Sequence, residues 1–254
     1  MSSQQEIRSF FDAVSVDRNR TLSAVPWLQY EQAARFQAVY ELLQIIPGEF
    51  ILDAGAGNLR DTLTLSQRGG RVCALDFSAR MLQEGLRSVT SEDNFSCVQG
   101  SALLLPFANQ SFDKILCSEV IEHVPESEAV FGEFRRCLKP GGVLVITTPN
   151  WNSLYGLNRK LVETGQRLLG RKPWGAHPYD EWSHPKRLEH SLSVNAFRIT
   201  SWIGICYLPG FSLGLLPKAL QRLVVKMVQS IEPRIRLRAP RWGYCIGIRA
   251  VKVE

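Results

Sequence analysis

The sequence predicts an α/β fold with a doubly wound, mainly parallel sheet. Between residues 50 and 148, short apolar segments alternate with segments of helical periodicity. Strands and helices that alternate in this way form parallel sheets with right-handed crossovers. The first apolar segment ends in an acid followed by two glycines, Asp53-Ala54-Gly55-Ala56-Gly57. This pattern is typical of a buried strand that turns tightly over a ligand into a helix, so a ligand site is expected at that turn.

The individual elements follow from the apolar runs and their terminators. Gly69-Gly70 is a typical helix stop, and Ser78 is a typical N-cap. Strands are predicted at 50–53, 71–76, 95–99, 112–117, 143–148, 198–207 and 243–253, and helices at 61–68, 78–87, 127–138 and 185–197. The main domain is therefore expected to extend over residues 48–254.

Residues 1–47 precede this domain and are predicted to be helical. Phe10, Phe11 and Val14 indicate one helix, and apolar residues at helical spacings between 30 and 46 indicate a second one, which Pro47-Gly48 ends. Two interpretations remain open. The leader covers the ligand site as a lid, or it packs against the domain without contacting a ligand.

Residues 150–189 interrupt the alternation of strands and helices. They are rich in Trp, Tyr, His, Gly and Pro, which is typical of loops or of a small cap. Polar and aromatic side chains are dense in this insert: Trp151, Tyr155, His177, Tyr179, Asp180, Trp182 and His184. We expect the insert either to contact the substrate, as an acceptor-site insert, or to pack as a cap.

The net charge of +6 is unevenly distributed along the chain. Residues 198–254 contain 10 Lys and Arg against 2 acids, whereas residues 1–197 contain 20 against 22. An enzyme of nucleic acids more often carries its cations around the mouth of its active site. No nucleic-acid partner is therefore expected, and the basic character belongs to the C-terminal part of the chain.

Residues 208–242 form a second insert with a basic amphipathic helix predicted at 217–231. One face of this helix is apolar: Leu220, Leu223, Val224, Met227, Val228 and Ile231. Another face is cationic, and further arginines follow: Lys218, Arg222, Lys226, Arg234, Arg236, Arg238 and Arg241. Such a helix either lies on an anionic membrane surface, through residues 217–241, or packs its apolar face on the domain with its cations in solvent.

The cysteines and the hydropathy pattern indicate a cytoplasmic protein, with peripheral membrane contact as the open alternative. Six cysteines fall singly within predicted elements, without zinc-type spacing, and are expected to be buried thiols in a reducing compartment. Charged residues occupy the N-terminal segment where a signal peptide needs an apolar core. The uncharged stretch 199–217 contains Pro209-Gly210 at its centre, which disfavours a membrane span.

Two acids define the chemistry of the ligand site. Asp53 and Asp76 end consecutive predicted strands, whose carboxyl ends should meet in one pocket. A carboxylate at the second position suits a ribose diol. The pyrophosphate fingerprint of dinucleotide enzymes needs a small residue where this chain has Arg60. Since Asp53 would also repel a pyrophosphate, the pocket favours a cationic nucleoside over a nicotinamide dinucleotide.

At this point the sequence resembles the class I S-adenosylmethionine-dependent methyltransferases, in particular type 11 methyltransferases and ubiquinone-biosynthetic O-methyltransferases. The matching segments occur in the family's order: Asp53–Gly57, Asp76, Gly100–Phe107 with 111–113, Glu119–Val124 and Leu138–Gly142. The resemblance implies a seven-stranded, Rossmann-like sheet with its last strand antiparallel. It also implies S-adenosylmethionine as the methyl donor.

The resemblance assigns roles to residues in this sequence. It implies that Gly55 and Gly57 lie against the methionine end of the donor, Asp76 on its ribose, and Ser101 with Ala102 beside its adenine. Asp53, Phe77 and Ser118 are further donor-binding candidates. Two positions depart from the family pattern: Leu59 replaces a third glycine, and Ser101 replaces an acid.

The catalytic candidate is His123. The sulfur that leaves during methyl transfer is neutral and needs no acid, so positioning carries most of the catalysis. An oxygen or nitrogen acceptor still has to lose a proton, which His123 would accept. The other interpretation is a histidine that packs under the pocket or caps a helix.

Glu119, Glu122 and His123 also form a metal-site hypothesis. Their spacing brings carboxylates and imidazole to one point if this turn is helical. The resemblance to ubiquinone-biosynthetic enzymes implies a divalent cation such as Mg²⁺ there. The alternative is a pocket wall without metal.

Together these observations predict an enzyme that methylates a small-molecule acceptor, with O-methylation of a hydrophobic, quinone- or phenol-like or lipid-linked substrate as the leading hypothesis. Two alternatives stay open: a protein or RNA methyltransferase, and a module that binds S-adenosylmethionine without catalysis. The oligomeric state is not predicted from the sequence.

Overall fold

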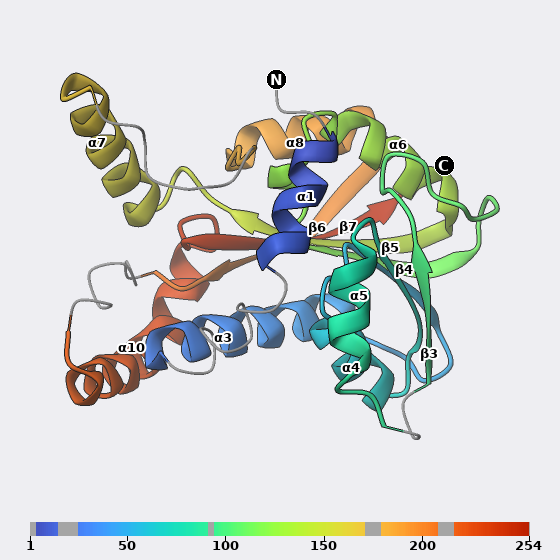
Figure 1. Cartoon of the computed structure of the whole chain (residues 1–254), viewed down its shortest axis with the longest axis horizontal. Helices are drawn as coiled ribbons and strands as arrows, with labels where there is room; N and C mark the ends of the chain where they lie inside the picture. The colour runs from blue at the N-terminus through green and yellow to red at the C-terminus, as the bar shows by residue number, and fades with distance from the viewer. Residues whose placement is uncertain (1–3, 15–24, 91–93, 171–178, 208–215, 254) are drawn as a thin grey trace.

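A seven-stranded sheet forms the centre of the computed structural model, which describes residues 4–14, 25–90, 94–170, 179–207 and 216–253 (Figure 1). The strand order is β3-β2-β1-β4-β5-β7-β6. Neighbouring strands among β1 to β5 are all parallel to one another. The strand β7 is antiparallel to both of its neighbours, β5 and β6. The predicted doubly wound, mainly parallel sheet with an antiparallel last strand is confirmed.

The strands lie close to their predicted positions: β1 Phe50–Ala54, β2 Arg71–Asp76, β3 Phe95–Gln99, β4 Phe112–Ser118, β5 Leu138–Pro149, β6 Phe197–Ile205 and β7 Cys245–Lys252. The main difference is the start of β5, which was expected at residue 143. Its first residue, Leu138, pairs with Phe112, and the register shifts before Val143 pairs with Lys114. The segment expected to be a turn into the strand is therefore part of an irregular strand.

Helices cover both faces of the sheet (Figure 1). One face carries α3, α4, α5 and α10, and the other carries α6 and α8. Their bounds are α1 Gln4–Val14, α3 Pro26–Leu43, α4 Arg60–Gln67, α5 Ala79–Leu86, α6 Ser127–Cys137, α7 Leu154–Leu168, α8 Pro185–Val194 and α10 Lys218–Arg238, with a short 3₁₀ helix, η1, at Ile121–His123. This double layer leaves the carboxyl ends of the parallel strands as the open edge of the domain.

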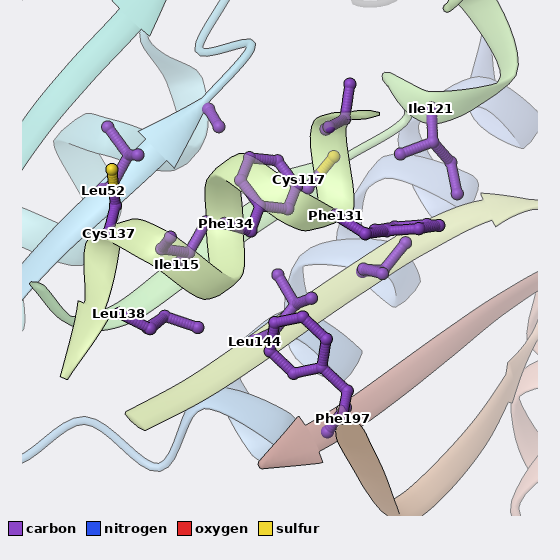
Figure 2. Close-up of a cluster of buried hydrophobic side chains, with 14 of the residues drawn as sticks. Leu52, Ile115, Cys117, Ile121, Phe131, Phe134, Cys137, Leu138, Leu144 and Phe197 are labelled. Carbon is purple, nitrogen blue, oxygen red and sulfur yellow. The ribbon is translucent and has the colours of Figure 1, made fainter. Parts of the chain in front are cut away.

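The larger core lies between the sheet and helices α6 and α8 (Figure 2). Phe131 and Phe134 point from α6 onto Ile115 of β4 and Leu144 of β5, and none of the four is more than 1% exposed. The apolar run of each central strand is buried on both sides because helices cover both faces, as expected for parallel strands.

Helix α3 of the leader belongs to the second core. Val39, Leu42 and Leu43 are buried against Ile51 of β1 and Val145 of β5. This half of the leader is thus an integral layer of the domain. Helix α1 is placed differently, above the open edge of the sheet, and is described with the site.

Two helices differ from their predictions. The insert 150–189, expected to be loop or cap, contains the 15-residue helix α7, because Trp, Gly and Pro elsewhere in the insert masked its helical spacing. Helix α10 is longer than the predicted 217–231 and buries Gln221, Val225 and Val228. Of the six residues in its predicted apolar face, Val224 and Val228 pack in the core, whereas Leu220, Leu223, Met227 and Ile231 stay exposed.

Two further expectations concern the cysteines, expected to be buried thiols, and the uncharged stretch 199–217, which was not expected to span a membrane. All six cysteines are free, and all but Cys97 are buried. No helix among the described residues is long and apolar enough to cross a membrane. Part of the uncharged stretch 199–217 is strand β6, and 208–215 lie outside the described residues.

Candidate active site

The candidate site is a cavity of about 800 Å³ at the carboxyl ends of β1, β2 and β4. Small-molecule pockets typically enclose about 300–1,000 Å³, and open α/β sheets bind ligands at this edge. The cavity wall contains ten of the residues predicted from the sequence: Gly55, Gly57, Asp76, Phe77, Ser101, Ala102, Ser118, Glu119, Glu122 and His123. It does not contain Asp53.

The glycine turn brings bare backbone to the cavity. Gly55 has a φ of +86°, and a Cβ built on it would lie 2.3 Å from Cγ2 of Val120. A side chain would therefore collide with the opposite wall. Gly57 also has a positive φ, of +53°, a conformation that costs glycine little.

Asp76 ties this turn to the next helix. Its Oδ2 accepts a hydrogen bond from the Gly57 amide at 2.8 Å, and its Oδ1 accepts one from the Ser78 amide at 2.8 Å. Each carboxylate oxygen has two lone pairs, so these bonds are compatible with accepting a ligand hydroxyl as well. The carboxylate is thus held rigidly by the backbone while it faces the cavity.

The neighbouring wall is formed by the loop after β3. Ser101 Oγ accepts a hydrogen bond from the Leu103 amide at 3.2 Å, so this hydroxyl shapes its own loop. Ala102, Leu103 and Met81 add apolar surface to the same wall. A flat, mostly apolar base would be held here by packing, with the serine in place of the acid that the family pattern leads one to expect.

Asp53 lies beneath the glycine turn rather than in the cavity wall. Its side chain is turned toward α4, where the Thr62 hydroxyl donates to Oδ2 at 2.6 Å, and it is 2% exposed. Burial, together with the nearby Asp61, raises the pKa of Asp53 to about 7. The predicted direct contact with a ligand finds no support in this geometry.

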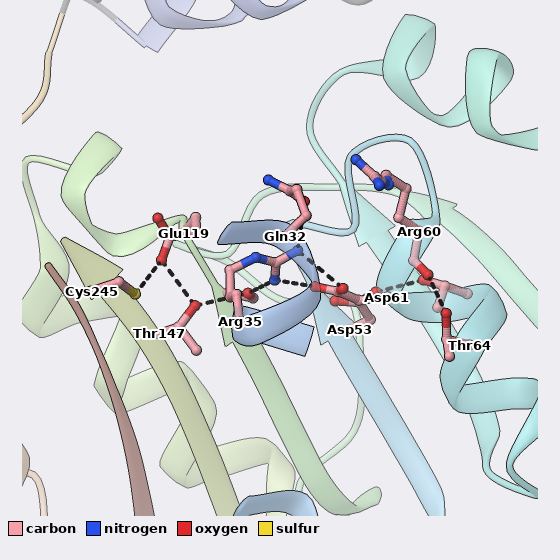
Figure 3. Close-up of polar contacts among 11 residues, drawn as sticks. Gln32, Arg35, Asp53, Arg60, Asp61, Thr64, Glu119, Thr147 and Cys245 are labelled. Atoms are coloured by element: carbon pink, nitrogen blue, oxygen red, sulfur yellow. Dashed lines mark hydrogen bonds and ion pairs between the residues drawn. The ribbon is translucent and has the colours of Figure 1, made fainter. Parts of the chain in front are cut away.

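Arg35 of α3 is a site residue that the sequence did not indicate (Figure 3). Its guanidinium binds Asp61 with both terminal nitrogens, at 2.7 and 3.2 Å, and Nη1 also donates to Ser118 Oγ. All three residues are part of the cavity wall. Arg35 therefore bridges the start of α4 and the end of β4, on the two sides of the glycine turn.

A chain of hydroxyls continues from Arg35 to Glu119. Thr147 Oγ1 lies 2.9 Å from Ser118 Oγ and donates to Glu119 Oε1 at 3.0 Å. Because Thr147 uses its proton on the carboxylate, Ser118 donates to Thr147. The Cys245 thiol also donates to Glu119 Oε1, at 3.1 Å. Burial is the larger cause, and the charge of Glu119 the second, that raises the pKa of Cys245 far above the ordinary value of a thiol. The chain thus runs in one direction from a cation to an anion.

His123 is fixed in one orientation by a backbone carbonyl. Its Nδ1 lies 3.1 Å from the Tyr179 carbonyl oxygen, which can only accept, so the ring carries its proton on Nδ1. In the neutral ring Nε2 then holds the lone pair. Phe11 packs edge-on against the imidazole, with ring centroids 5.2 Å apart.

Glu119, Glu122 and His123 do not form the common point that the metal hypothesis needs. Residues 121–123 form a 3₁₀ turn, the carboxylate of Glu122 accepts from the Thr148 hydroxyl at 3.1 Å, and its Oε1 lies 4.0 Å from His123 Nε2. Burial, then Glu119, raises the pKa of Glu122 well above its ordinary value, which favours the neutral acid. Among the described residues, no group of three His, Cys, Asp or Glu side chains is placed to hold a metal ion.

Aromatic side chains close the cavity opposite the glycine turn. Trp182 and Tyr244 are part of its wall, with ring centroids 5.5 Å apart. Tyr155, in the first turn of α7, stacks on Trp182 at 5.5 Å. Tyr244 was not predicted; it reaches the site because β7 runs antiparallel to β5 and begins where β5 ends.

The predicted aromatic insert is thus divided between several roles. Trp182 and Asp180 are in the cavity wall. Trp151 packs on Trp182, and His184 binds the Asn152 side chain. Tyr179 acts through its carbonyl on His123, and His177 lies outside the described residues.

Helix α1 lies over the cavity (Figure 1). Ile7, Phe10 and Phe11 are part of the wall, and Phe11 packs on Phe77 with ring centroids 5.9 Å apart. The Ser78 hydroxyl donates to Asp12, which ties α1 to the N-cap of α5. The two helices of the leader are thus placed differently: α1 lines the cavity, whereas α3 packs as a layer of the domain.

The charges of the wall favour a cationic ligand. Besides Glu122, whose raised pKa favours the neutral form, the acids there are Glu31, Asp61, Asp76, Glu119 and Asp180, against two arginines, Arg35 and Arg60. A ligand with several phosphates would meet mostly like charge, whereas a sulfonium nucleoside would not.

Comparison with known proteins identifies the family. A model described as a methyltransferase domain matches residues 52–146. A demethylmenaquinone methyltransferase from Thermobifida fusca is 32% identical over 179 residues, which cover 70% of this chain and 74% of that protein. Another, from Tropheryma whipplei strain Twist, is 34% identical over 212 residues, which cover 78% and 85%. This chain belongs to the class I S-adenosylmethionine-dependent methyltransferases.

The fold of this methyltransferase agrees with that of solved relatives. A crystal structure of a methyltransferase from Thermotoga maritima superposes on 97% of this chain and 99% of its own, with a TM-score of 0.67 at 16% identity. S-adenosylmethionine is the methyl donor. The residues present fit it: Gly55 and Gly57 line the cavity with backbone that carries no side chain, and the acids of the wall suit its cationic sulfonium.

A pH titration of stability tests the buried carboxyl under the donor turn. The folded methyltransferase holds the Asp53 proton up to a pH of about 7, whereas the ordinary value is 3.8. Raising the pH through this window favours the unfolded chain, which has already released that proton. The stability from protonated Asp53 is thus fully present below the unfolded pKa and lost as pH approaches the folded one.

We expect Asp53→Asn to lack this part of the pH dependence. At about 1.36 kcal/mol per pKa unit, the wild type should lose up to roughly 4 kcal/mol relative to the variant between pH 4 and 7. Urea unfolding at a series of pH values measures the difference. Parallel curves for the two proteins would show that Asp53 is ionised in the folded state.

Proposed function

We propose that this methyltransferase methylates a small hydrophobic acceptor of the quinol or phenol type, at a ring oxygen. The aromatic wall of Trp182 and Tyr244 supports an acceptor with a flat ring, since such rings stack favourably on one another. The names of the demethylmenaquinone methyltransferases to which the chain is similar support the same acceptor class.

The observation that carries the proposal is the orientation of His123. With Nδ1–H held by the Tyr179 carbonyl, Nε2 is the nitrogen that can accept a proton. It belongs to the same wall as Trp182 and Tyr244. A quinol ring stacked on the aromatic wall would present a hydroxyl to this nitrogen, as general-base catalysis requires.

The donor supplies an electrophilic methyl group on a sulfonium whose sulfur leaves as a neutral thioether. His123 takes the hydroxyl proton, and the resulting phenolate oxygen forms the bond to the methyl carbon as the sulfur–methyl bond breaks. The product side is then S-adenosylhomocysteine, a methyl ether and an imidazolium. Proximity and alignment of the two substrates supply most of the rate.

For the donor, we propose that its methionine end lies against Gly55, Gly57 and Ser118. Asp76 accepts hydrogen bonds from the ribose hydroxyls. The adenine is surrounded by Phe77, Ser101 and Ala102. Arg35 acts as a positioning residue. Its bonds to Asp61 and Ser118 hold the two sides of the turn at a fixed separation.

We further propose that α1 is a lid. It carries Phe11 across Phe77 on the donor side and His123 on the acceptor side. A helix with apolar contacts to both half-sites would exclude water during transfer, which protects the phenolate from solvent protons.

Peripheral attachment to a membrane, through residues 217–241, is a part of the proposal that matches a lipid-soluble acceptor. It is supported by the cations of α10 and by its exposed apolar side chains.

The acceptor class is tested with the purified protein, labelled S-adenosylmethionine and a water-soluble short-chain naphthoquinol kept reduced by dithionite. We expect label in the naphthoquinol as a methyl ether, identified by mass spectrometry. Bulk transfer RNA and a protein extract serve as competing acceptors. Label in either of these with none in the quinol would overturn the acceptor class, and label on a ring carbon would overturn only the methylated atom.

The role of His123 is tested with His123→Gln, which keeps a donor for the Tyr179 carbonyl but has no base. The rate with naphthoquinol should fall about 10²–10⁴-fold, while the dissociation constant of S-adenosylhomocysteine stays unchanged. The rate of the variant should also rise about tenfold per pH unit, because only the free phenolate then reacts. A variant with a wild-type pH profile would refute the assignment.

The role of Asp76 is tested by a thermodynamic cycle that combines the mutation of Asp76 with removal of the ribose hydroxyls from the ligand. Asp76→Ala should weaken S-adenosylhomocysteine binding by on the order of 1.5–3 kcal/mol, since hydrogen bonds to charged groups are lost. A 2′,3′-dideoxy analogue should lose similar affinity for the wild type and almost none for the variant. Equal losses for both proteins, measured by calorimetry, would mean that Asp76 only shapes the turn.

A further inference from the structure

Exposed apolar side chains of this methyltransferase are concentrated on α7 and α10. These helices and the residue after α7 carry eleven of the sixteen large hydrophobic side chains that are exposed among the described residues. Scattered single residues of this kind are normal on protein surfaces, whereas a concentration marks an interaction site. In Figure 1 the two helices lie at the same end of the molecule, away from α4 and α5.

On each helix the exposed side chains form one stripe. On α7 the stripe consists of Leu154, Leu157, Leu161 and Leu168, and on α10 it consists of Leu220, Leu223, Met227 and Ile231. The spacings of three, four and seven residues place the members of each stripe on a single face. Leu161 is 66% exposed and Met227 57%, so the faces are bare. We call these two stripes together the docking face.

Cations lie on both helices, and on α10 Lys218, Arg222 and Lys226 form a row along one side of the stripe. Helix α10 contains six, Lys218, Arg222, Lys226, Arg234, Arg236 and Arg238, against one acid, Glu232. Glu232 is turned inward, where it accepts from the Tyr207 amide at 2.8 Å, and burial raises its pKa. Lys160 and Arg167 lie beside the stripe of α7. The docking face is therefore apolar with a positive border.

We propose that the docking face binds the surface of an anionic lipid bilayer. Two parallel requirements are met: apolar side chains for the boundary of the acyl chains and cations for the negative headgroups. A second copy of the chain fits less well. In a two-fold symmetric contact the same surface of both copies meets, so the cations of one copy would lie near the cations of the other and repel them. Two stripes on separate helices at one end of the molecule also suit a broad surface better than a groove.

The docking face leads to the acceptor end of the cavity. Tyr155 and the first stripe residue, Leu154, are neighbours in the first turn of α7, and Tyr155 stacks on Trp182 of the cavity wall. If the acceptor is lipid-soluble, as the proposed function has it, a docked enzyme takes it up beside α7 without passing it through water. This consequence rests on the proposed acceptor, whereas the docking extends the proposed peripheral attachment from residues 217–241 to α7 and does not depend on which acceptor is methylated.

Vesicle flotation with the full chain tests the proposal. We expect binding to vesicles of phosphatidylcholine with phosphatidylglycerol, weaker binding to phosphatidylcholine alone, and a decrease with added salt. Arg222→Gln with Lys226→Gln should weaken binding to the anionic vesicles roughly 25-fold, at about fivefold per cation near the surface. Leu157→Gln with Leu161→Gln, and Leu223→Gln with Met227→Gln, should each abolish most of it.

The matched control is Ile46→Gln with Val194→Gln, which removes equally exposed apolar side chains away from α7 and α10. It should float like the wild type. All variants should keep the wild-type melting temperature, because the replaced side chains are exposed. Equal flotation on neutral and anionic vesicles, or flotation that the α7 and α10 variants retain, would overturn the proposal. So would a wild-type dimer that the α10 variant converts to monomers.

The two proposals fail separately. The same variants should methylate the water-soluble naphthoquinol at the wild-type rate when no lipid is present. A wild type that floats but methylates no quinol leaves the docking face intact and refutes the acceptor. A wild type that methylates the quinol but does not float refutes the docking face and the peripheral attachment, and leaves the proposed acceptor intact.

Discussion

The arrangement of the site depends on one buried cation. The Arg35 guanidinium belongs to α3, yet it binds Asp61 at the start of α4 and Ser118 at the end of β4. Removing such a charge from water is costly unless its hydrogen-bonding groups are matched. Here the hydrogen bonds of Arg35 join three segments of the chain, α3, α4 and β4. The hydroxyls of Ser118 and Thr147 extend this network to Glu119, which also accepts from Cys245. The geometry of the glycine turn is thus coupled to that of the cavity wall around Glu119 and Tyr244.

Two kinds of carboxyl group lie in and beneath the cavity wall. Asp76 and Glu119 are held by donors, from the backbone amides and from the thiol and hydroxyl groups respectively. Asp53 and Glu122 are buried beside other acids, and their pKa values are raised. The cavity therefore presents the Asp76 carboxylate to a cationic donor, while the raised pKa values of Asp53 and Glu122 reduce the repulsion among the acids in and beneath its wall.

The local features of the site were predictable from the sequence, because they depend on neighbours in the chain. Gly55, Gly57 and Asp76 sit at the ends of strands whose parallel order follows from alternation with helices. The direction of the Asp53 side chain was not predictable, since it depends on Thr62 packing beneath the turn. Arg35 and Tyr244 were missed for a different reason. They come from the two ends of the chain, and only the tertiary fold brings them to the cavity.

The same limit applies to α10. Helical spacing identified its apolar residues, but it could not tell which of two adjacent faces the domain would cover. The structure buries the face with Gln221, Val225 and Val228 and leaves the stripe with Leu223 and Met227 exposed. In α7, a compositional bias toward loop residues in the surrounding insert concealed a regular helix altogether.

The position of β7 has a consequence for how the protein is made. This strand, the last of the chain, is inserted between β5 and β6, and its Gly247 leaves no room for a side chain beside Leu42 of α3. Before β7 forms, β5 is paired only with β4, β6 has no partner strand, and α3 lacks part of the surface it covers. A folding intermediate without β7 therefore has a nearly complete sheet from β3 to β5 and an open edge where β6 and Tyr244 belong.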